Sequence, residues 1–303
     1  MAYIVKYIKE FTDHEKIKAA CAKDVALGYR VKVFASPKKR CGISMENVTF
    51  EYVDKPMEQA VKAAKACYAE KCQIYLKRAI YSVDPREYDF AEKIRELDYE
   101  EAQELSVNGF NGIMYEVFDL AKRNSVRLEV LSLSDSEPTV IKEVSGVGEK
   151  IIKSMSKDTD INIVTLTEIP DKKGITYHIF KVLSDKDIYV DSIMLPAANH
   201  SQQDISFCIK GGDAKTVSDL LLAHRDSLQF KDIIINDNVA KISVMGAGFH
   251  TQKGIATRLL EVLYENDINI MTIFTSEVKI SVIIDKTQAD KAIRAIHKKL
   301  ISG

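Results

Sequence analysis

The feature that most constrains the fold of this chain is a unit that occurs twice in its C-terminal half. Residues 161–190 read as a strand, a tight loop, an amphipathic helix and a second strand, and residues 241–270 repeat that order eighty positions later. A glycine ends the loop in both copies, Gly174 in the first and Gly254 in the second, and the apolar positions of the following helices match. We therefore expect two domains of one fold with equivalent loops.

Each copy is followed by a further strand and helix, predicted at 204–209 and 214–224 in the first copy and at 278–284 and 288–300 in the second. A strand at 231–236 completes a βαββαβ order in the first copy, whereas no sixth element follows the last helix of the second. Because native folds usually cover an open sheet edge, we expect the strand 139–144 to close the second domain. The first domain, 161–238, is then inserted into the second, which comprises 139–160 and 239–303.

Residues 1–138 show a different pattern, in which strands and helices alternate. Strands are predicted at 3–7, 31–34, 44–53, 73–81 and 126–132, with helices at 14–27, 57–69, 99–107 and 113–123. Such alternation is typical of a mostly parallel sheet covered by helices. The predicted fold class is α/β for this segment and α+β, with two ferredoxin-like βαββαβ domains, for the rest.

Composition argues against several classes of function. The 43 Lys and Arg residues nearly balance the 44 Asp and Glu, so no overall positive field would attract nucleic acid. The five cysteines, at 21, 41, 67, 72 and 208, contain no Cys-x-x-Cys pair, which favours reduced thiols over disulfides or a zinc site. No apolar run approaches the roughly 18 residues of a membrane span. We expect a cytoplasmic protein without nucleic-acid, membrane or metal partners.

The duplicated loop has the chemistry of an anion site. A strand that leads through a glycine turn into a helix N-terminus directs backbone N–H groups, and the positive end of the helix dipole, at one point. The carboxylate of an amino acid suits such a point, and Asp171, Asp191, Asp204 or Glu277 could accept hydrogen bonds from its ammonium group. The alternative is that each glycine only forms a turn, but duplication of the whole loop favours a ligand site.

At these residues the chain resembles the paired ACT domains at the C-terminus of aspartokinases. The resemblance covers nearly all of 139–303 and is clearest at Thr167-Glu-Ile-Pro-Asp-Lys-Lys-Gly174, at 238–250 and at 275–281. It implies that the first domain is inserted in the second, and that the domains pair across subunits and bind a feedback amino acid, such as lysine or threonine, at the interface.

Carried over by position, the resemblance implies a set of effector-binding residues. In the first repeat these are Asp171, Gly174, Ile175, Thr176, Met194 and Asp204, and in the second they are His250, Gly254, Ile255, Ser276 and Glu277. The chain departs from the family where Lys173 and Lys253 replace the usual prolines, and where Leu195-Pro196 replaces a Gln-Asn pair.

The N-terminal half resembles the aspartokinase catalytic domain only in fragments. Lys6-Tyr-Ile-Lys-Glu-Phe11 stands where the family has Lys-Phe-Gly-Gly-Thr-Ser, residues 53–58 lack the Arg-Gly-Gly-Ser-Asp substrate motif, and 76–80 replace the nucleotide loop. Asp84 and Arg86 survive as a remnant of the nucleotide site. Because phosphoryl transfer depends on positioning and charge neutralisation, we expect 1–138 to be a truncated catalytic-domain remnant with no catalytic residues and no cofactor.

The leading hypothesis is an amino-acid-binding regulatory protein. It would sense an aspartate-family amino acid, of the lysine or threonine type, in a homodimer formed through its ACT domains, and report to a catalytic aspartokinase subunit. The alternative is an active aspartate kinase of reduced size, which would use ATP and Mg²⁺ to form 4-phospho-aspartate for lysine, threonine and methionine biosynthesis. A third hypothesis is a structural subunit whose ligand site has decayed.

Overall fold

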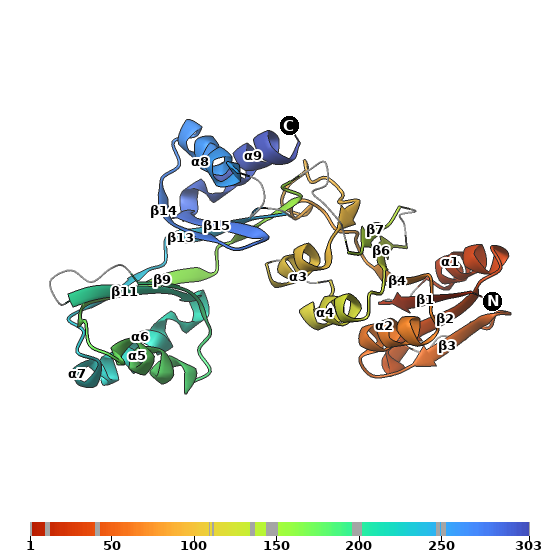
Figure 1. The fold of residues 1–303 in the computed structure, drawn as a ribbon, viewed down its shortest axis with the longest axis horizontal. Coiled ribbons are helices and arrows are strands. Elements are labelled where there is room, and N and C mark those ends of the chain that lie inside the picture. The colour runs from red at the N-terminus through yellow and green to blue at the C-terminus, as the bar shows by residue number, and fades with distance from the viewer. Residues whose placement is uncertain are drawn as a thin grey trace.

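The computed structural model describes residues 2–9, 13–39, 43–108, 110, 112–133, 137–143, 151–195, 202–246, 249 and 253–302, which form three sheets (Figure 1). One sheet belongs to the N-terminal domain, and each of the two repeats builds a sheet of its own. We call these repeats the first and the second repeat domain. In Figure 1 the first repeat domain and the N-terminal domain lie on opposite sides, with the second repeat domain above and between them.

The N-terminal sheet has seven strands in the order β3-β2-β1-β4-β6-β7-β5. Its strands are β1 (Tyr3–Ile8), β2 (Arg30–Ala35), β3 (Val48–Tyr52), β4 (Lys71–Leu76), β5 (Glu96–Leu97), β6 (Leu128–Ser132) and β7 (Thr139–Ile141). The central pairs are parallel, and β7 runs antiparallel to β6. β1, β4 and β6 are buried along almost their whole length because helices cover both faces of a parallel sheet.

Helices cover the two faces of this sheet unequally. On one face α1 (His14–Ala26) packs through Ile17 and Cys21, and on the other α2 (Pro56–Ala66), α3 (Tyr99–Val107) and α4 (Tyr115–Arg123) share a core with β4 and β6 (Figure 1). A short 3₁₀ turn, Pro37–Lys39, follows β2. The N-cap of α3 is a capping box, in which Asp98 accepts from the Glu101 amide and Glu101 accepts from the Asp98 amide.

The first repeat domain has the predicted βαββαβ order, and the second has the same fold with its closing strand placed first in the chain. The first contains β9 (Ile161–Pro170), α5 (Ile175–Ser184), β10 (Val190–Met194), β11 (Gln202–Lys210), α6 (Ala214–Ala223), α7 (Arg225–Leu228) and β12 (Ile233–Asn236), in the sheet order β10-β11-β9-β12. The second contains β8 (Ser154–Asp158), β13 (Val239–Met245), α8 (Ile255–Glu265), β14 (Ile270–Thr275), β15 (Lys279–Asp285) and α9 (Ala289–Ile296), in the order β14-β15-β13-β8. Short turns at Gly211–Asp213 and Lys286–Gln288 precede α6 and α9, and a π-helical segment, His297–Ile301, follows α9.

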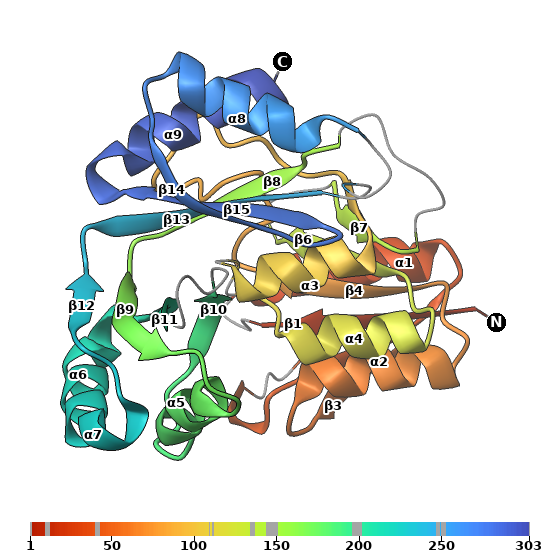
Figure 2. The ribbon, with the colours of Figure 1, turned by 60° about the vertical axis from the view of Figure 1, so that its left-hand side comes forward.

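The strand that closes the second repeat domain is not the one expected. Residues 139–144 were predicted for this role, but β7 lies in the N-terminal sheet, where the Thr139 hydroxyl donates to the Ile94 carbonyl at 2.6 Å. The closing strand is β8, which pairs antiparallel with β13. β8 was not predicted from the sequence, because Ser154, Ser156 and Lys157 give this segment a polar pattern that is not typical of a strand. The insertion of the first repeat domain into the second is confirmed, and Figure 2 shows the chain leaving through β8–β9 and returning through β12–β13.

The face of the second repeat domain's sheet that carries no helix contacts both neighbouring domains. Met245 lies in the core of the N-terminal domain, and Lys279 Nζ lies 2.8 Å from Glu104 Oε2 on α3. At the other end of the same face, Lys241 Nζ lies 2.8 Å from Asp191 Oδ2 of the first repeat domain. One sheet face therefore connects all three parts of the described chain.

A buried ion pair fixes α1 to the N-terminal sheet. Lys6, in the middle of β1, is fully buried, and its ammonium group contacts the Asp24 carboxylate of α1, Gln73 Oε1 and the Tyr75 hydroxyl. Burial alone would lower the pKa of Lys6, but Tyr75 and Asp24 outweigh it and raise that pKa above its usual value. Lys6 is therefore a charged group whose stability in the core depends on Asp24.

We predict that Asp24→Asn destabilises the chain by about 3–5 kcal/mol, because it leaves the buried Lys6 without its counter-charge. Urea unfolding at neutral pH measures the loss. The control is Glu15→Gln on the same helix, whose partner Lys18 is exposed and whose loss should be at most about 1 kcal/mol. Equal losses in the two variants would contradict the prediction.

The Asp98 cap predicts a pH dependence of a definite sign. Burial raises the pKa of Asp98 to about 6, although the Glu101 amide opposes the shift. Its unfolded value is about 3.9, so the folded chain binds the extra proton between about pH 4 and about pH 6, and this contribution to stability is lost as the pH rises through that window. Asp98→Asn keeps a capping oxygen but cannot titrate.

We therefore expect the stability of Asp98→Asn relative to the parent chain to increase as the pH rises from about 4 to about 6. Urea midpoints across this range give the difference. Asp13→Asn at the N-cap of α1 is the matched control: the Lys16 amide lowers the pKa of Asp13, so its stability relative to the parent chain changes mainly below about pH 4 and should not increase between about pH 4 and about pH 6. The same trend in both variants would refute the assignment.

Candidate functional site

The two loop glycines adopt the same left-handed backbone conformation. Gly174 has φ 92° and caps α5, and Gly254 has φ 89° and caps α8. A Cβ atom added at either position would meet nothing within 4 Å, so the backbone conformation, and not lack of space, favours glycine there. The loop that is duplicated in the sequence therefore has the same backbone conformation at its glycine in both copies, and a helix begins after it in each.

In the first repeat domain the predicted effector residues gather at one end of the sheet. Asp171, which is exposed, follows the end of β9, and β11 places Gln202 opposite Pro170. Asp204 Oδ1 accepts from the Glu168 amide at 2.9 Å, beside an irregular pairing of β9 with β11. Met194 is the last residue of β10, so the loop, the end of β10 and the start of β11 lie at the same end of the sheet. The start of α5, with Gly174, Ile175 and Thr176, lies there too.

In the second repeat domain the equivalent edge is built by a hairpin. Ser276 and Glu277 lie exposed between β14 and β15, and the Ser276 amide donates to the Lys279 carbonyl at 2.7 Å. The Gly246 amide donates to the Val278 carbonyl at 3.0 Å, which holds the end of β13 beside this hairpin. Gly254 and Ile255 begin α8, while His250 lies outside the described residues.

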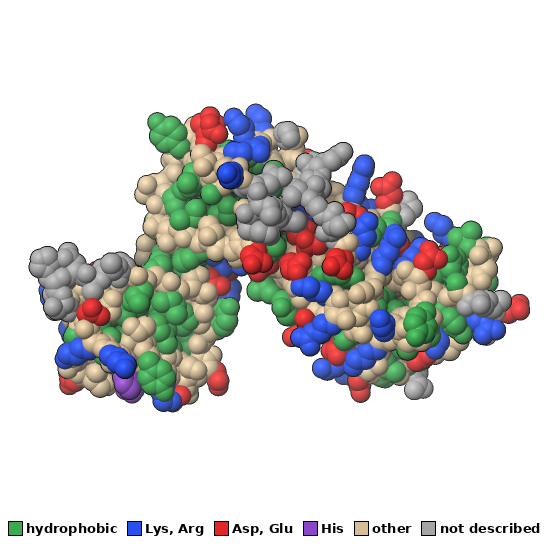
Figure 3. Space-filling model, viewed as in Figure 1, with side chains coloured by type: hydrophobic (Ala, Val, Ile, Leu, Met, Phe, Trp, Pro, Cys, Tyr) green, Lys and Arg blue, Asp and Glu red, His purple; other side chains and the backbone are tan. Residues whose placement is uncertain are grey.

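Each repeat domain also presents an outer strand with exposed apolar side chains. In the first it is β10, where Ile193 is 50% exposed, and in the second it is β14, where Met271 is 44% exposed. Figure 3 shows hydrophobic side chains on the surface of both repeat domains. An edge strand of this kind is a template for pairing with another chain.

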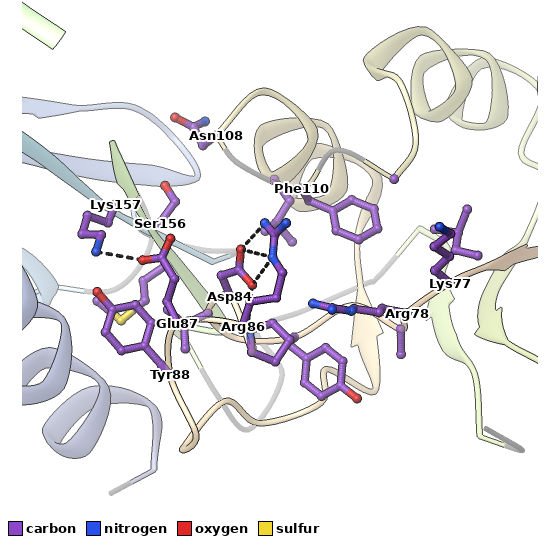
Figure 4. A pocket seen from close by; sticks show the side chains of 18 of the residues that line it. Lys77, Arg78, Asp84, Arg86, Glu87, Tyr88, Asn108, Phe110, Ser156 and Lys157 are labelled. Carbon is purple, nitrogen blue, oxygen red and sulfur yellow. Dashed lines mark hydrogen bonds and ion pairs between the residues drawn. The ribbon is translucent and has the colours of Figure 1, made fainter. Parts of the chain in front are cut away.

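A separate cavity of about 520 Å³ lies where β1 and β4 end, between the N-terminal domain and β8 (Figure 4). Its charged lining comprises Lys9, Lys77, Arg78, Asp84, Arg86, Glu87 and Lys157, and its apolar lining includes Leu76, Tyr81 and Phe110. The predicted nucleotide-site remnant therefore faces a real cavity. Ligands of open α/β sheets bind outside the carboxyl ends of the strands, and this cavity has that position.

Asp84 and Arg86 bind each other inside this cavity (Figure 4). Arg86 Nε donates to both Asp84 carboxylate oxygens at 3.0 Å, Arg86 Nη2 contacts the same group, and the Arg86 amide donates to Asp84 Oδ1 at 2.9 Å. The Arg86 side chain lowers the pKa of the Asp84 carboxyl, which burial would raise. The two surviving motif residues thus neutralise one another.

Sequence reasoning missed the cationic rim of the cavity. Lys9 follows β1, Lys77 and Arg78 follow β4, and Lys157 comes from β8. The first three could have been found, because basic residues directly after two apolar parallel strands must meet at one sheet edge. Lys157 could not, because it reaches the cavity only through the unexpected strand.

Two further properties concern the described part of the chain alone. Its helices include none that is long and apolar enough to cross a membrane. Within the same ranges, no three His, Cys, Asp or Glu side chains are grouped so that they could hold a metal ion.

The sequence matches known proteins in both halves. The family model of the ACT domain matches residues 242–300. An aspartokinase from Helicobacter pylori is 33% identical over 248 residues, which cover 78% of this chain and 60% of the relative. The aspartate kinase Ask_LysC from Stutzerimonas stutzeri is 30% identical over 241 residues, covering 78% and 58%. The chain thus spans about 60% of the length of the curated relatives it matches.

Solved structures show the same fold along nearly the whole chain. An aspartate kinase from Clostridium acetobutylicum superposes with a TM-score of 0.76 at 15% identity, over 98% of this chain and 70% of the other. Aspartokinase III from E. coli, solved with lysine and aspartate, gives a TM-score of 0.66 at 18% identity, over 99% and 70%. These two likenesses show the fold, and the sequence matches show that the chain belongs to the aspartokinase family, with ACT domains in its C-terminal half.

Proposed function

We propose that this chain is an amino-acid-sensing regulatory protein of the aspartokinase family. The observation that carries the proposal is the duplicated loop, in which Gly174 and Gly254 adopt one conformation and each opens a helix at the end of a sheet. Backbone N–H groups at a helix N-terminus favour a carboxylate, and Asp171 or Glu277 would accept from the ammonium group of the same ligand. An aspartate-family amino acid, of the lysine or threonine type, fits this pairing of charges.

The partner in this proposal is a second copy of the chain, paired through the ACT domains. Edge pairing through β10 or β14 would cover Ile193 and Met271, whose apolar side chains are about half exposed. Met194, at the end of β10, packs against an apolar cluster that includes Val239 and Ile283 of the second repeat domain. A ligand shared between two subunits couples binding to assembly, because it binds only where both walls are present. A catalytic aspartokinase is the proposed recipient of this signal.

The proposal assigns no phosphoryl transfer to the N-terminal domain. Lys6 stands where the family motif begins, and here it is fully buried against Asp24 and does not line the cavity. Lys9 occupies a position where the family has glycine, whose backbone could approach a phosphate closely. Asp84 and Arg86 are engaged with each other. These contacts support the proposal that the N-terminal domain is a remnant of a kinase domain.

A thermal-shift screen against the twenty amino acids tests the sensor. One amino acid should stabilise the chain, by about 2.7 kcal/mol at a hundred times its dissociation constant. Asp171→Ala and Glu277→Ala should weaken that ligand at least about tenfold, or about 1.4 kcal/mol. Asp185→Ala is the control, since Asp185 lies at the other end of α5 and binds Lys181. No shift with any amino acid would instead favour a structural subunit.

The second candidate function, a reduced aspartate kinase, rests on the cationic cavity. Lys9, Lys77 and Arg78 lie at strand ends where phosphate groups could bind. We expect no aspartyl phosphate when the chain is incubated with ATP, Mg²⁺ and aspartate, as measured by trapping with hydroxylamine. Turnover that disappears in Arg78→Ala but persists in Arg123→Ala, a surface arginine of α4, would establish the kinase and overturn the proposal.

A further inference from the structure

One segment of the N-terminal domain is built into the second repeat domain. Residues 82–92, which we call the strap, follow β4 and carry Asp84, Arg86 and Glu87 along one wall of the cavity (Figure 4). Ser156 and Lys157 of β8 line the cavity beside the strap, where Lys157 binds Glu87 (Figure 4). Both domains therefore contribute to the cavity lining, and the strap contacts both of them.

Apolar side chains of the strap lie in the core of the second repeat domain. Val83 and Tyr88 are buried in the same cluster as Met155 of β8 and Ile293 of α9. Phe90 packs against that cluster, and its ring centroid lies 4.7 Å from that of His297. This burial ties the strap to α9 and β8, although its chain neighbours belong to the N-terminal sheet.

Polar contacts fix the position of the strap along α9. The Tyr88 hydroxyl donates to Asp290 Oδ1 at 2.5 Å, and Lys157 Nζ lies 2.8 Å from both Asp290 Oδ1 and Glu87 Oε2. These four side chains, which we call the Tyr88 cluster, come from the strap, β8 and α9. Charge-assisted hydrogen bonds are more directional and stronger than neutral ones, so the cluster fixes both the distance and the orientation of the strap relative to α9.

A second, buried attachment lies at the start of the strap. The Ser82 carbonyl accepts from the Met155 amide at 2.7 Å, which joins the strap backbone to β8. Ser82 Oγ lies 2.8 Å from His297 Nε2, and both side chains are almost fully buried. Because the strap is held at Ser82 and again at Tyr88, Asp84 and Arg86 lie between two points that are fixed to the second repeat domain.

We infer that the strap is a coupling element, through which the arrangement of the second repeat domain sets the position of the Asp84–Arg86 pair in the cavity. A shift of α9 or β8 moves the Tyr88 cluster and, with it, the cavity wall. By linkage the reverse also holds, so a molecule that contacts the strap in the cavity changes the second repeat domain. The inference deepens the proposed function by naming a route for its signal, but the coupling itself requires no amino acid.

Hydrogen exchange of the ligand-free full chain tests the coupling. Tyr88→Phe with Asp290→Asn removes the hydrogen bond from Tyr88 to α9 and the charge that pairs with Lys157, with little change in side-chain volume. Amides of the strap that are bonded inside the protein, such as those of Ser82, Glu87 and Tyr88, should exchange at least about tenfold faster. Amides of α1 and β9, in the N-terminal and first repeat domains, should keep the parental rates.

The matched control is Tyr177→Phe with Asp185→Asn on α5, which removes the same chemical groups where Tyr177 is exposed and Asp185 binds only its helix neighbour Lys181 among the described contacts. It should leave the strap unchanged. A strap that exchanges at the parental rate in Tyr88→Phe/Asp290→Asn overturns the inference. So does faster exchange spread equally over α1 and β9, since that would report loss of global stability. Neither result bears on amino-acid binding, which the thermal-shift screen decides separately.

Discussion

The antiparallel pairing of β8 with β13 is the interaction on which the C-terminal half depends. It joins Ser154–Asp158 to residues that follow the entire first repeat domain, so the second repeat domain exists only when both crossings of the chain lie side by side. The same strand brings Met155 to the Ser82 carbonyl and Lys157 to Glu87. The pairing of β8 with β13 therefore underlies the insertion of one domain in the other, the contact between the second repeat domain and the N-terminal domain, and part of the cavity lining.

The second repeat domain acts as a platform for the other two. Its helix-free sheet face contacts α3 through Lys279 and the first repeat domain through Lys241, whereas its helix-covered side holds the strap. The two contact areas differ in physical character. The first repeat domain meets the platform through a small apolar cluster and two ion pairs, Lys241–Asp191 and Lys210–Asp158, while the strap is embedded in the core. A difference of this kind lets one contact change while the other stays fixed.

The two candidate regions have opposite electrostatic designs. The loops at Gly174 and Gly254 offer helix N-termini with acidic neighbours, which suits a ligand that carries both charges. The cavity offers Lys9, Lys77 and Arg78, but its only acidic lining residues among those described, Asp84 and Glu87, are bound by Arg86 and Lys157. The repeat-domain loops therefore present both signs of charge, whereas the cavity presents mainly cationic side chains.

The sequence by itself determined the elements and their duplication, because helix and strand periods are local properties of neighbouring residues. It predicted the two βαββαβ domains, the insertion and the α/β character of the N-terminal segment, and Asp84 and Arg86 do face the cavity. Only the tertiary structure decided which strand closes the second repeat domain: β8 is too polar to be recognised, and backbone pairing with β13, rather than side-chain pattern, makes it a strand. For the same reason Lys157 and the strap's contacts with α9 could not be read from the sequence, since they join residues that lie far apart in the chain and meet only after the sheet has formed.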